Sequence, residues 1–443
     1  MNRRNFMRTI ASVPFLGALA KPERAGAQTC GGASHPLAGK PLPAWKPGEF
    51  QVHFIYTGVC ESMFWIMPDG TTMLLDCGDH PAINRGKKAV WVLPNGNTHA
   101  GEWIARYVTR VNPAKTAVDY MMLSHHHSDH GGRDDWGAGT RKWKGQKLSV
   151  SGFLHAADTL KFDTCFDRGW PDFNDPIPNE LCDASCYRHM RQTFEYLAER
   201  DGLKMEKFNV GAVNQVALRR NAAAFPGFKI TNITGNGKIL RRDGTLRDLY
   251  EELHGAKRLN ENGMSLGLMV QYGPFRFYTA GDFSDSPRLP DGSRRNIETE
   301  LAKELDPVDV AKVNHHGHYS MPIALVAALR PRVWTACMWD QLHITADSLE
   351  RMCDRAAYPG ERLVAAGVFS PLRRFEDAGK AFLSDIAPEA FAAGHVVLTV
   401  APGGATYSIA YVTADDESMK VTGAYDFASG ALRSPAAIDG RKS

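Results

Sequence analysis

Apolar and polar residues alternate over three short segments near the start of the ordered-looking sequence. These segments cover residues 50–56, 61–67 and 71–75, and Pro68-Asp69-Gly70 lies between the last two. A period of two with a turn between runs predicts an antiparallel meander. Apolar residues recur at helical spacing over 102–111, and the continuous apolar run at 118–123 predicts a buried strand.

The same patterns continue along the rest of the chain, alternating between strands and helices. Strands are predicted at 148–154, 228–233, 265–272, 275–279, from 309, and at 333–338, 395–401 and 406–412; helices are predicted at 187–199, 246–254, 348–357 and 380–392. The alternation favours an α+β fold. We expect one domain at 28–414, after an extended lead-in to about 48, with an insertion at about 156–227 and a loose tail over 415–443.

The first 27 residues have the features of an export signal. A twin-arginine pattern at Arg3-Arg4 precedes an apolar run, Ile10 to Ala20, and Ala25-Gly26-Ala27 is a small-residue cleavage site. The alternative is a membrane anchor, but the run has about half of the ~20 residues that span a bilayer. We expect export by the twin-arginine machinery to a periplasmic or secreted location, with no membrane span in the mature chain.

Composition and charge narrow the class of protein. The 43% hydrophobic and 23% charged residues are ordinary for a globular domain. The full chain carries a net charge of +3, but residues 1–27 hold five basic residues and one acidic residue, so the mature chain carries −1. This balance gives no signal for nucleic-acid binding. Of the eight cysteines, Cys165, Cys182 and Cys186 are close in sequence and are disulfide candidates in an oxidising compartment.

A histidine cluster follows the apolar run at 118–123. From Ser124 to Gly132 the sequence reads Ser-His-His-His-Ser-Asp-His-Gly-Gly. Imidazole and carboxylate are ligands for zinc and similar cations, and the spacing predicts two points of convergence, His125 with His127 and Asp129 with His130. A solvated histidine-rich loop is the alternative. Two later strands also end in ligand-type residues, Asp282 and the pair His315-His316.

Together these motifs resemble the metallo-β-lactamase fold superfamily, and within it the hydrolase domain of the ComEC competence proteins and its free-standing relatives. The resemblance rests on Leu75-Asp76-Cys77-Gly78, the histidine cluster, Ala280-Gly281-Asp282 and Lys312 to Gly317. The likeness to the ComEC domain rests on Asn262-Gly263-Met264-Ser265 before a strand and on the His-His-Gly ending at 315–317. It implies a four-layer αβ/βα sandwich that binds one or two zinc ions, with manganese as an alternative. The implied ligands are His125, His127, Asp129, His130, Asp282 and His316, and Asp76 would orient a ligand from behind.

The chain departs from the family at the third motif. A histidine is expected there at a strand end, but the strand at 228–233 runs into Thr234-Gly235-Asn236. His155, His189 and His254 lie in the interval without matching strand ends. A one-metal enzyme using Asp129, His130, Asp282 and His316 is therefore a live alternative to a two-metal enzyme.

The resemblance implies a hydrolase that acts through a metal-activated water. Asp129 would orient the water or take its proton, and His315 would face the substrate as a proton donor, although the roles of His315 and His316 could be reversed. Weaker candidates for substrate contact are Arg168, Trp170, His318 and His343. We expect a small phosphodiester or ester as substrate. A β-lactam or lactone, or a non-catalytic metal-binding scaffold, is the alternative.

Overall fold

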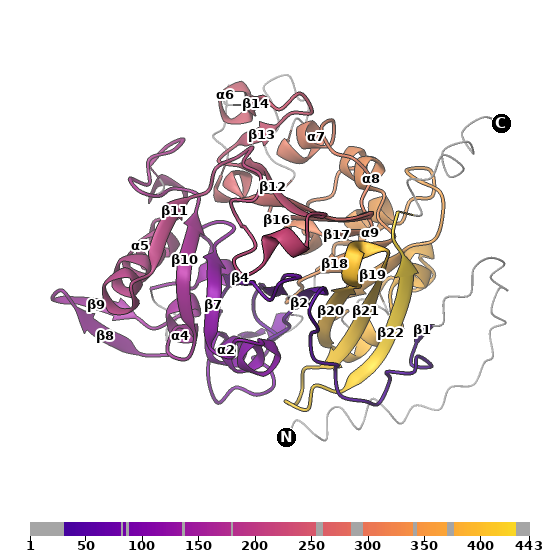
Figure 1. The fold of residues 1–443 in the computed structure, drawn as a ribbon, viewed down its shortest axis with the longest axis horizontal. Helices are drawn as coiled ribbons and strands as arrows, with labels where there is room; N and C mark the ends of the chain where they lie inside the picture. Colours follow the sequence, from indigo (N-terminus) through magenta and orange to yellow (C-terminus); the bar gives the residue numbers. More distant parts are fainter. Residues whose placement is uncertain are drawn as a thin grey trace.

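Two large mixed sheets organise the chain (Figure 1). The computed structural model describes residues 31–80, 83–85, 88–134, 138–178, 180–253, 260–284, 296–339, 343–369 and 376–430. The proposed signal at 1–27, together with Cys30 and His254, lies outside these residues. The described part is a mixed α and β protein, which agrees with an α+β class.

The first sheet contains ten strands in the described part of the chain. In spatial order they are β1 (Gly31–Gly32), β22 (Val421–Ala428), β21 (Thr406–Thr413), β20 (Gly394–Val400), β2 (Phe50–Phe54), β3 (Ser62–Ile66), β4 (Thr72–Cys77), β7 (Ala117–Met122), β10 (Lys161–Asp167) and β11 (Lys204–Lys207). Neighbours from β1 to β4 are antiparallel, whereas β4, β7, β10 and β11 run parallel.

The second sheet contains eight strands among the described residues. Their order is β14 (Leu246–Asp248), β13 (Lys238–Leu240), β12 (Phe228–Gly235), β15 (Gly267–Tyr272), β16 (Phe275–Ala280), β17 (Val310–Lys312), β18 (Val333–Ala336) and β19 (Leu363–Ala366). The strands from β16 to β19 are parallel. Two small ribbons pair β5 (Ile83–Arg85) with β6 (Lys88–Val90), and β8 (Thr140–Trp143) with β9 (Gln146–Ser149).

The helices are mostly short and connect the strands. They are α2 (Ala100–Val111), α3 (Ser128–Gly131), α4 (Gly152–Ala156), α5 (Glu180–Asp201), α6 (Leu249–Leu253), α7 (Ile297–Leu301), α8 (Ile323–Leu329) and α9 (Ala346–Met352). Helix α2 forms because Ile104, Ala105 and Val108 recur at helical spacing and give it one apolar face, which is buried. No helix in the described ranges is both long and apolar enough to cross a membrane.

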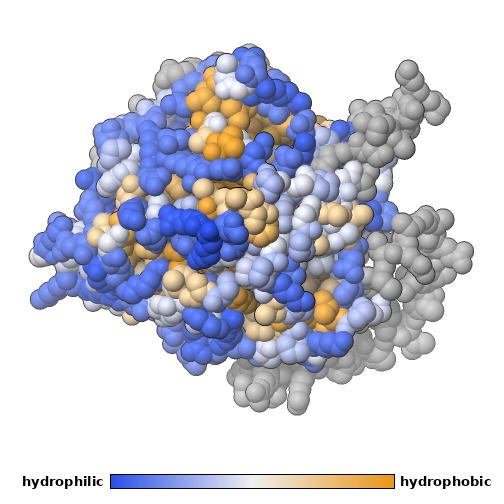
Figure 2. All heavy atoms as spheres, in the orientation of Figure 1, coloured by the Kyte–Doolittle hydropathy of each residue, from blue (hydrophilic) through white to orange (hydrophobic). Residues whose placement is uncertain are grey.

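The sheets pack on each other through aromatic side chains. Phe50 contacts Phe228, and both Phe54 and Trp65 contact Phe277, with ring centroids 5.3–6.3 Å apart. Along β3 the side chains alternate: Trp65 belongs to this inter-sheet core, whereas its neighbours Phe64 and Ile66 belong to a second core with residues of α2 and α5. Both faces of the first sheet are therefore buried at β3. Figure 2 shows that the outer surface is largely hydrophilic on the face drawn, with smaller apolar patches.

Four expectations of local structure need correction. Residues 148–154 are not one strand, because β9 ends at Ser149 and Gly152, with φ of +52°, begins α4. The helix expected at 246–254 begins with strand β14. The helix expected at 380–392 is two short 3-10 turns, Ala381–Asp385 and Pro388–Ala392. The expectation of a loose tail over 415–443 is wrong as far as Ala428, because β22 pairs with β21 from Thr406 to Val412.

The disulfide expectation also fails for Cys165, which is buried in β10 and free within the described structure. Cys186 is buried on α5, and the side chain of Cys182 lies outside the described residues.

Candidate metal centre

The ligand-type residues meet at the carboxyl ends of parallel strands in both sheets. Asp76 is the penultimate residue of β4. The histidine cluster follows β7, which runs parallel to β4. In the second sheet Asp282 follows β16, and His316 follows β17. Backbone bonds join the two edges, since Leu266 N–H donates to Ser124 O at 3.0 Å. Carboxyl ends of parallel strands are the usual place for ligand sites in such sheets.

His130 is held from behind by Asp76. The His130 Nδ1 atom lies 2.8 Å from Asp76 Oδ2, and the same carboxylate accepts hydrogen bonds from the backbone N–H and the hydroxyl of Ser124, both at 2.7 Å. With Nδ1 engaged in this way, His130 Nε2 faces Asp282 Oδ2 at 3.0 Å. Asp76 is therefore placed to fix the ring orientation and tautomer of His130, as in carboxylate–histidine–metal arrangements.

His316 presents its other nitrogen to the same point. Its Nδ1 donates to the backbone oxygen of Cys337 at 2.7 Å, so in the neutral ring Nε2 carries the lone pair, to which Trp339 Nε1 also donates at 3.3 Å. That Nε2 atom lies 3.2 Å from Asp129 Oδ2 and 3.2 Å from Asp282 Oδ2. Asp129 Oδ2 is in turn 3.8 Å from His130 Nε2. Asp129, His130, Asp282 and His316 thus converge, although they come from three separate segments of sequence.

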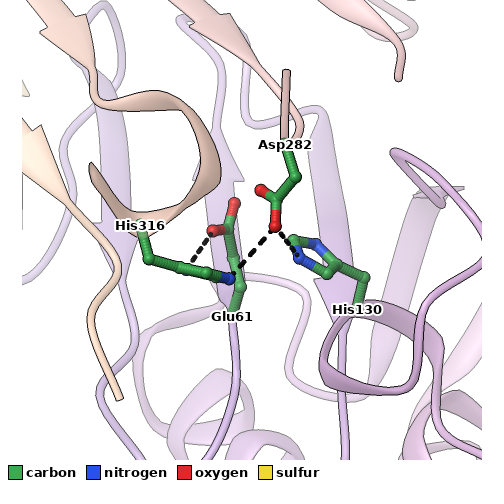
Figure 3. Close-up of side chains that lie close together, drawn as sticks. All are labelled: Glu61, His130, Asp282 and His316. Carbon is green, nitrogen blue, oxygen red and sulfur yellow. Dashed lines mark hydrogen bonds and ion pairs between the residues drawn. The ribbon is translucent and has the colours of Figure 1, made fainter. Parts of the chain in front are cut away.

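Glu61, at the start of β3, is a further member of the centre that the sequence analysis missed (Figure 3). Its Oε2 lies 3.3 Å from His316 Nδ1, and its Oε1 lies 2.8 Å from Lys312 Nζ. These contacts are electrostatic, because neither Glu61 oxygen accepts a well-aligned hydrogen bond from the described residues. In the sequence, Glu61 could have been noticed as a single carboxylate at the start of the apolar run that ends at Met67, since a buried carboxylate is rare.

Among the described residues, Glu61, His130, Asp282 and His316 form a buried group that can hold a metal ion. One ligand atom from each lies within 4.8 Å of the others. The charge balance of the site fits a cation: the carboxylates of Glu61, Asp76, Asp129 and Asp282 are faced by one ammonium group, that of Lys312. One oxygen of Asp282, Oδ1, is buried without a hydrogen-bond partner in the described structure. Uncompensated buried carboxylates are costly unless a cation or a proton neutralises them.

The pKa values reflect this surplus of negative charge. Burial by itself lowers the pKa of His130, but Asp282, Asp76 and Asp129 together raise it well above its ordinary value. The pKa of His316 is raised in the same way, by Asp282, Asp129 and Glu61 against burial. Carboxylates that hold a proton on imidazole in this way are equally suited to hold a divalent cation.

His125 and His127 lie beside this group but outside it. Their rings face each other with His125 Nε2 and His127 Nδ1 3.1 Å apart, and the His125 ring centroid is 4.2 Å from that of His130. Within the described residues neither belongs to a set of three ligand-type groups that could enclose a second ion. Burial lowers the pKa of His125 well below its ordinary value, with the neighbouring imidazoles of His130 and His127 acting in the same direction.

A buried ion pair lies at the end of β12, where the resemblance led us to expect a histidine. Asn236, just after β12, accepts a hydrogen bond from Arg168 Nη1 at 3.1 Å and donates one to Arg168 O at 2.7 Å. Arg168 also binds Glu261 through Nε at 2.8 Å and through Nη2, and both side chains are 1% exposed. Glu261 Oε1 accepts the backbone N–H of His126 at 2.7 Å. This placement corrects the expectation for Arg168, which supports the histidine cluster and is closed to substrate.

Two of the histidines considered for the third motif, His155 and His189, lie near Asp79 instead. Asp79 accepts from Ser151 Oγ at 3.1 Å and pairs with His99 at 3.0 Å, while His189 Nε2 lies 3.3 Å from Ser151 O. His155 is electrostatically coupled to the same carboxylate. Trp170 is half-buried and packs on Phe173, with ring centroids 6.1 Å apart.

Imidazoles surround His316 on the side away from Asp76. His343 stacks on His316 with ring centroids 4.9 Å apart, and His318 lies 5.6 Å from His315 and 5.8 Å from His343. His315 Nε2 is 3.3 Å from Asn262 Nδ2, and burial lowers the pKa of His315 to about 4. Both His315 and His316 have positive φ, 49° and 52°, a strained backbone that is characteristic of functional sites.

No protein-family model matches the chain, and no characterised protein matches it in sequence.

Proposed function

We propose that this chain is an exported, metal-dependent hydrolase of the metallo-β-lactamase superfamily, with zinc as the resident metal and a small phosphodiester or ester as substrate. The observation that carries the proposal is the convergence of Asp129, His130, Asp282 and His316. Donor atoms of a tetrahedral zinc ion with ligands at ~2.0–2.1 Å lie about 3.3 Å apart. Four of the six separations among these donor atoms are 3.0, 3.2, 3.2 and 3.8 Å.

The superfamily's four-layer αβ/βα sandwich is part of the same proposal. It is supported by the aromatic packing between the two sheets and by the burial of α2 and α5 residues in the core on the opposite face of the first sheet. The ligand set favours one ion, because Asn236, bound to Arg168, stands at the third motif and leaves His125 and His127 without a further ligand-type neighbour among the described residues.

A zinc ion at this point would acidify a bound water molecule and stabilise negative charge on the substrate. The protein side chains have distinct parts in that reaction. Asp129 is the most exposed of the four convergent residues, with 16% of its side chain accessible, and in this proposal it orients the water and accepts its proton. Asp76 and the backbone oxygen of Cys337 hold His130 and His316 with Nε2 directed inward.

His315 is the proposed hydrogen-bond donor to the leaving group. With a pKa of about 4 it is neutral near pH 7, so its one N–H can stabilise negative charge on the leaving group by a hydrogen bond, while the proton that the leaving group needs comes from water. If the Asn262 amide donates to Nε2, that proton is on Nδ1, which is buried and has no hydrogen-bond partner in the described structure. The proposed donation therefore requires the His315 side chain to reorient when a substrate binds.

Metal analysis of the mature protein is the first test. We expect about one zinc per chain, and we expect chelation to abolish hydrolysis and zinc to restore it. Asp129→Ala should lose metal-dependent activity by at least ~100-fold. The matched control is Asp306→Ala, which removes an exposed surface carboxylate and should leave activity unchanged. Absence of any transition metal from the purified chain would refute the proposal.

Substrate class is tested on the same metal-loaded protein with bis-para-nitrophenyl phosphate, an aryl ester, a lactone and nitrocefin. We expect turnover of the phosphodiester or the ester. Hydrolysis of the lactone or nitrocefin alone would favour the β-lactamase or lactonase alternative. Full metal occupancy with no turnover of any substrate would favour a metal-binding scaffold.

A further inference from the structure

A fully buried lysine lies directly behind the metal centre, and the proposed reaction makes no use of it. Lys312 is the last residue of β17, and its side chain is 0% exposed. Its Nζ donates to the backbone oxygen of Ala280 at 2.9 Å, lies 3.4 Å from that of Gly281, and lies 3.9 Å from Asp282 Oδ1. The ammonium group therefore contacts both the backbone that leads to Asp282 and the carboxylate oxygen that faces away from His130.

Glu61 is the partner of Lys312 and links it to the other sheet. The Glu61 side chain, 1% exposed, reaches Lys312 Nζ at 2.8 Å and His316 Nδ1 at 3.3 Å. Its backbone is also part of the centre, because Glu61 N–H donates to Asp129 O at 2.9 Å. The pair thus touches the surroundings of Asp129, Asp282 and His316.

Glu61 contacts Nδ1 of His316, whereas an ion at the centre would bind Nε2 of the same ring. Asp282 lies at Nε2, whereas Glu61 lies at Nδ1 (Figure 3). Asp129 also lies at Nε2, and the proton on Nδ1 is donated to Cys337 O. A carboxylate at that position favours a proton on Nδ1 and makes Nε2 a better donor to a metal.

We propose that the Glu61–Lys312 ion pair is a positioning device for the metal centre. Lys312 holds the backbone and the outer oxygen of Asp282, and Glu61 holds His316 from its Nδ1 side, so that Asp282 Oδ2 and His316 Nε2 point at one ion. This inference rests on the proposed metal centre. Glu61 is a positioning residue in it, not a ligand.

The test measures metal affinity and the absorption spectrum of the cobalt-substituted protein, neither of which depends on knowing the substrate. We expect Glu61→Gln and Lys312→Met each to weaken zinc and cobalt binding by about 10–100-fold, the usual effect of losing a residue that orients a ligand. Both variants should shift the cobalt spectrum in the same way. The double variant should bind no more weakly than the singles, because the two residues act as a unit.

Glu300→Gln is the matched control. Glu300 is a buried carboxylate on α7 that pairs with Arg247 at 2.7 Å and with Lys303 at 2.8 Å. Its substitution should reduce thermal stability without changing metal affinity or the cobalt spectrum. If a single variant at Glu61 or Lys312 does not fold, the double variant is measured instead, because it removes both buried charges together.

The outcomes separate this inference from the proposed function. Wild-type protein that binds no metal overturns both. Wild-type protein that binds metal, beside folded variants with unchanged affinity, overturns the positioning role alone. A spectral change in Glu61→Gln without one in Lys312→Met would make Glu61 a ligand and also overturn it. Metal binding weakened in both variants supports the inference even if no substrate is hydrolysed.

Discussion

Removing Arg168 should destabilise the protein far more than removing a surface arginine. Arg168 and Glu261 are both 1% exposed, so Arg168→Met leaves a carboxylate buried with the N–H of His126 as its remaining strong contact. Breaking a buried pair on one side costs about 3–5 kcal/mol. The shifted pKa of Glu261 gives a similar figure. Burial raises that pKa, but Arg168 and His126 lower it to about 2 from 4.5, which corresponds to about 3 kcal/mol of stability.

The pH dependence has a definite sign. Because the pKa of Glu261 is lower in the folded protein than in the unfolded chain, its contribution is present above pH 4.5 and is lost as the pH falls toward 2. Chemical denaturation near pH 7 should therefore show a loss of about 3–5 kcal/mol for Arg168→Met. The double variant Arg168→Met/Glu261→Gln should recover part of this loss, because no unpaired charge remains.

Two results would refute this reasoning. One is a loss below about 1 kcal/mol for Arg168→Met, the value typical of exposed ion pairs. The other is a double variant whose loss equals the sum of the single losses, because residues that act as a pair are not additive. Arg276→Met, which removes a half-exposed arginine paired with Asp306, is the control and should change stability little.

Three further predictions concern Gly78, two buried histidines and removal of the metal. Gly78→Ala should weaken metal binding in titrations, because the added Cβ would lie 1.9 Å from Asp129 O. The control variant Gly139→Ala should bind metal normally, because a Cβ at that position meets nothing within 4 Å. Burial lowers the pKa of His53 and of His395 to about 3, with His395 adding to the effect on His53 and Arg110 to the effect on His395. Because both histidines are neutral in the folded protein and protonated in the unfolded chain at pH 5, each should lower the free energy of unfolding by about 2 kcal/mol at pH 5 relative to pH above 6.5. Denaturation at the two pH values measures this, and unchanged stability would contradict it. Chelation should lower the melting temperature, since metal at about 1,000 times its Kd stabilises by ~4 kcal/mol, and an unchanged melting temperature would count against a resident ion.

The sequence located most of the centre because ligand-type residues followed predicted strands. His130, Asp282 and His316 each come just after an apolar segment, and the structure brings all three together with Asp129. Strand ends are visible in a hydrophobic pattern, and parallel strands share an edge, so these positions were accessible to sequence reasoning. The antiparallel meander at β2 to β4 was predictable for the same reason.

The remaining features of the site and fold could not be predicted, because they depend on contacts between segments that are distant in sequence. Glu61 and Lys312 are ordinary charged residues until the two sheets pack and bury them against each other. The loop position of Arg168 suggested exposure, whereas its partner Glu261 is 93 residues away in sequence. Strand β22 was missed because three of its eight residues are polar or glycine, and its pairing with β21 is what makes it a strand.

The cost of burying the carboxylates explains why this edge of the fold points to a function. Asp76, Glu61 and Asp282 are almost fully buried, and Asp129 is partly buried, around two imidazoles and one ammonium group. A fold selected for stability alone would place apolar residues at these strand ends, because an uncompensated buried charge is among the most destabilising features of a protein. Carboxylates at these positions favour binding of a cation that balances them. Local departures from the rules of stability of this kind concentrate at functional sites, which is the physical reason for proposing a metal centre at this edge.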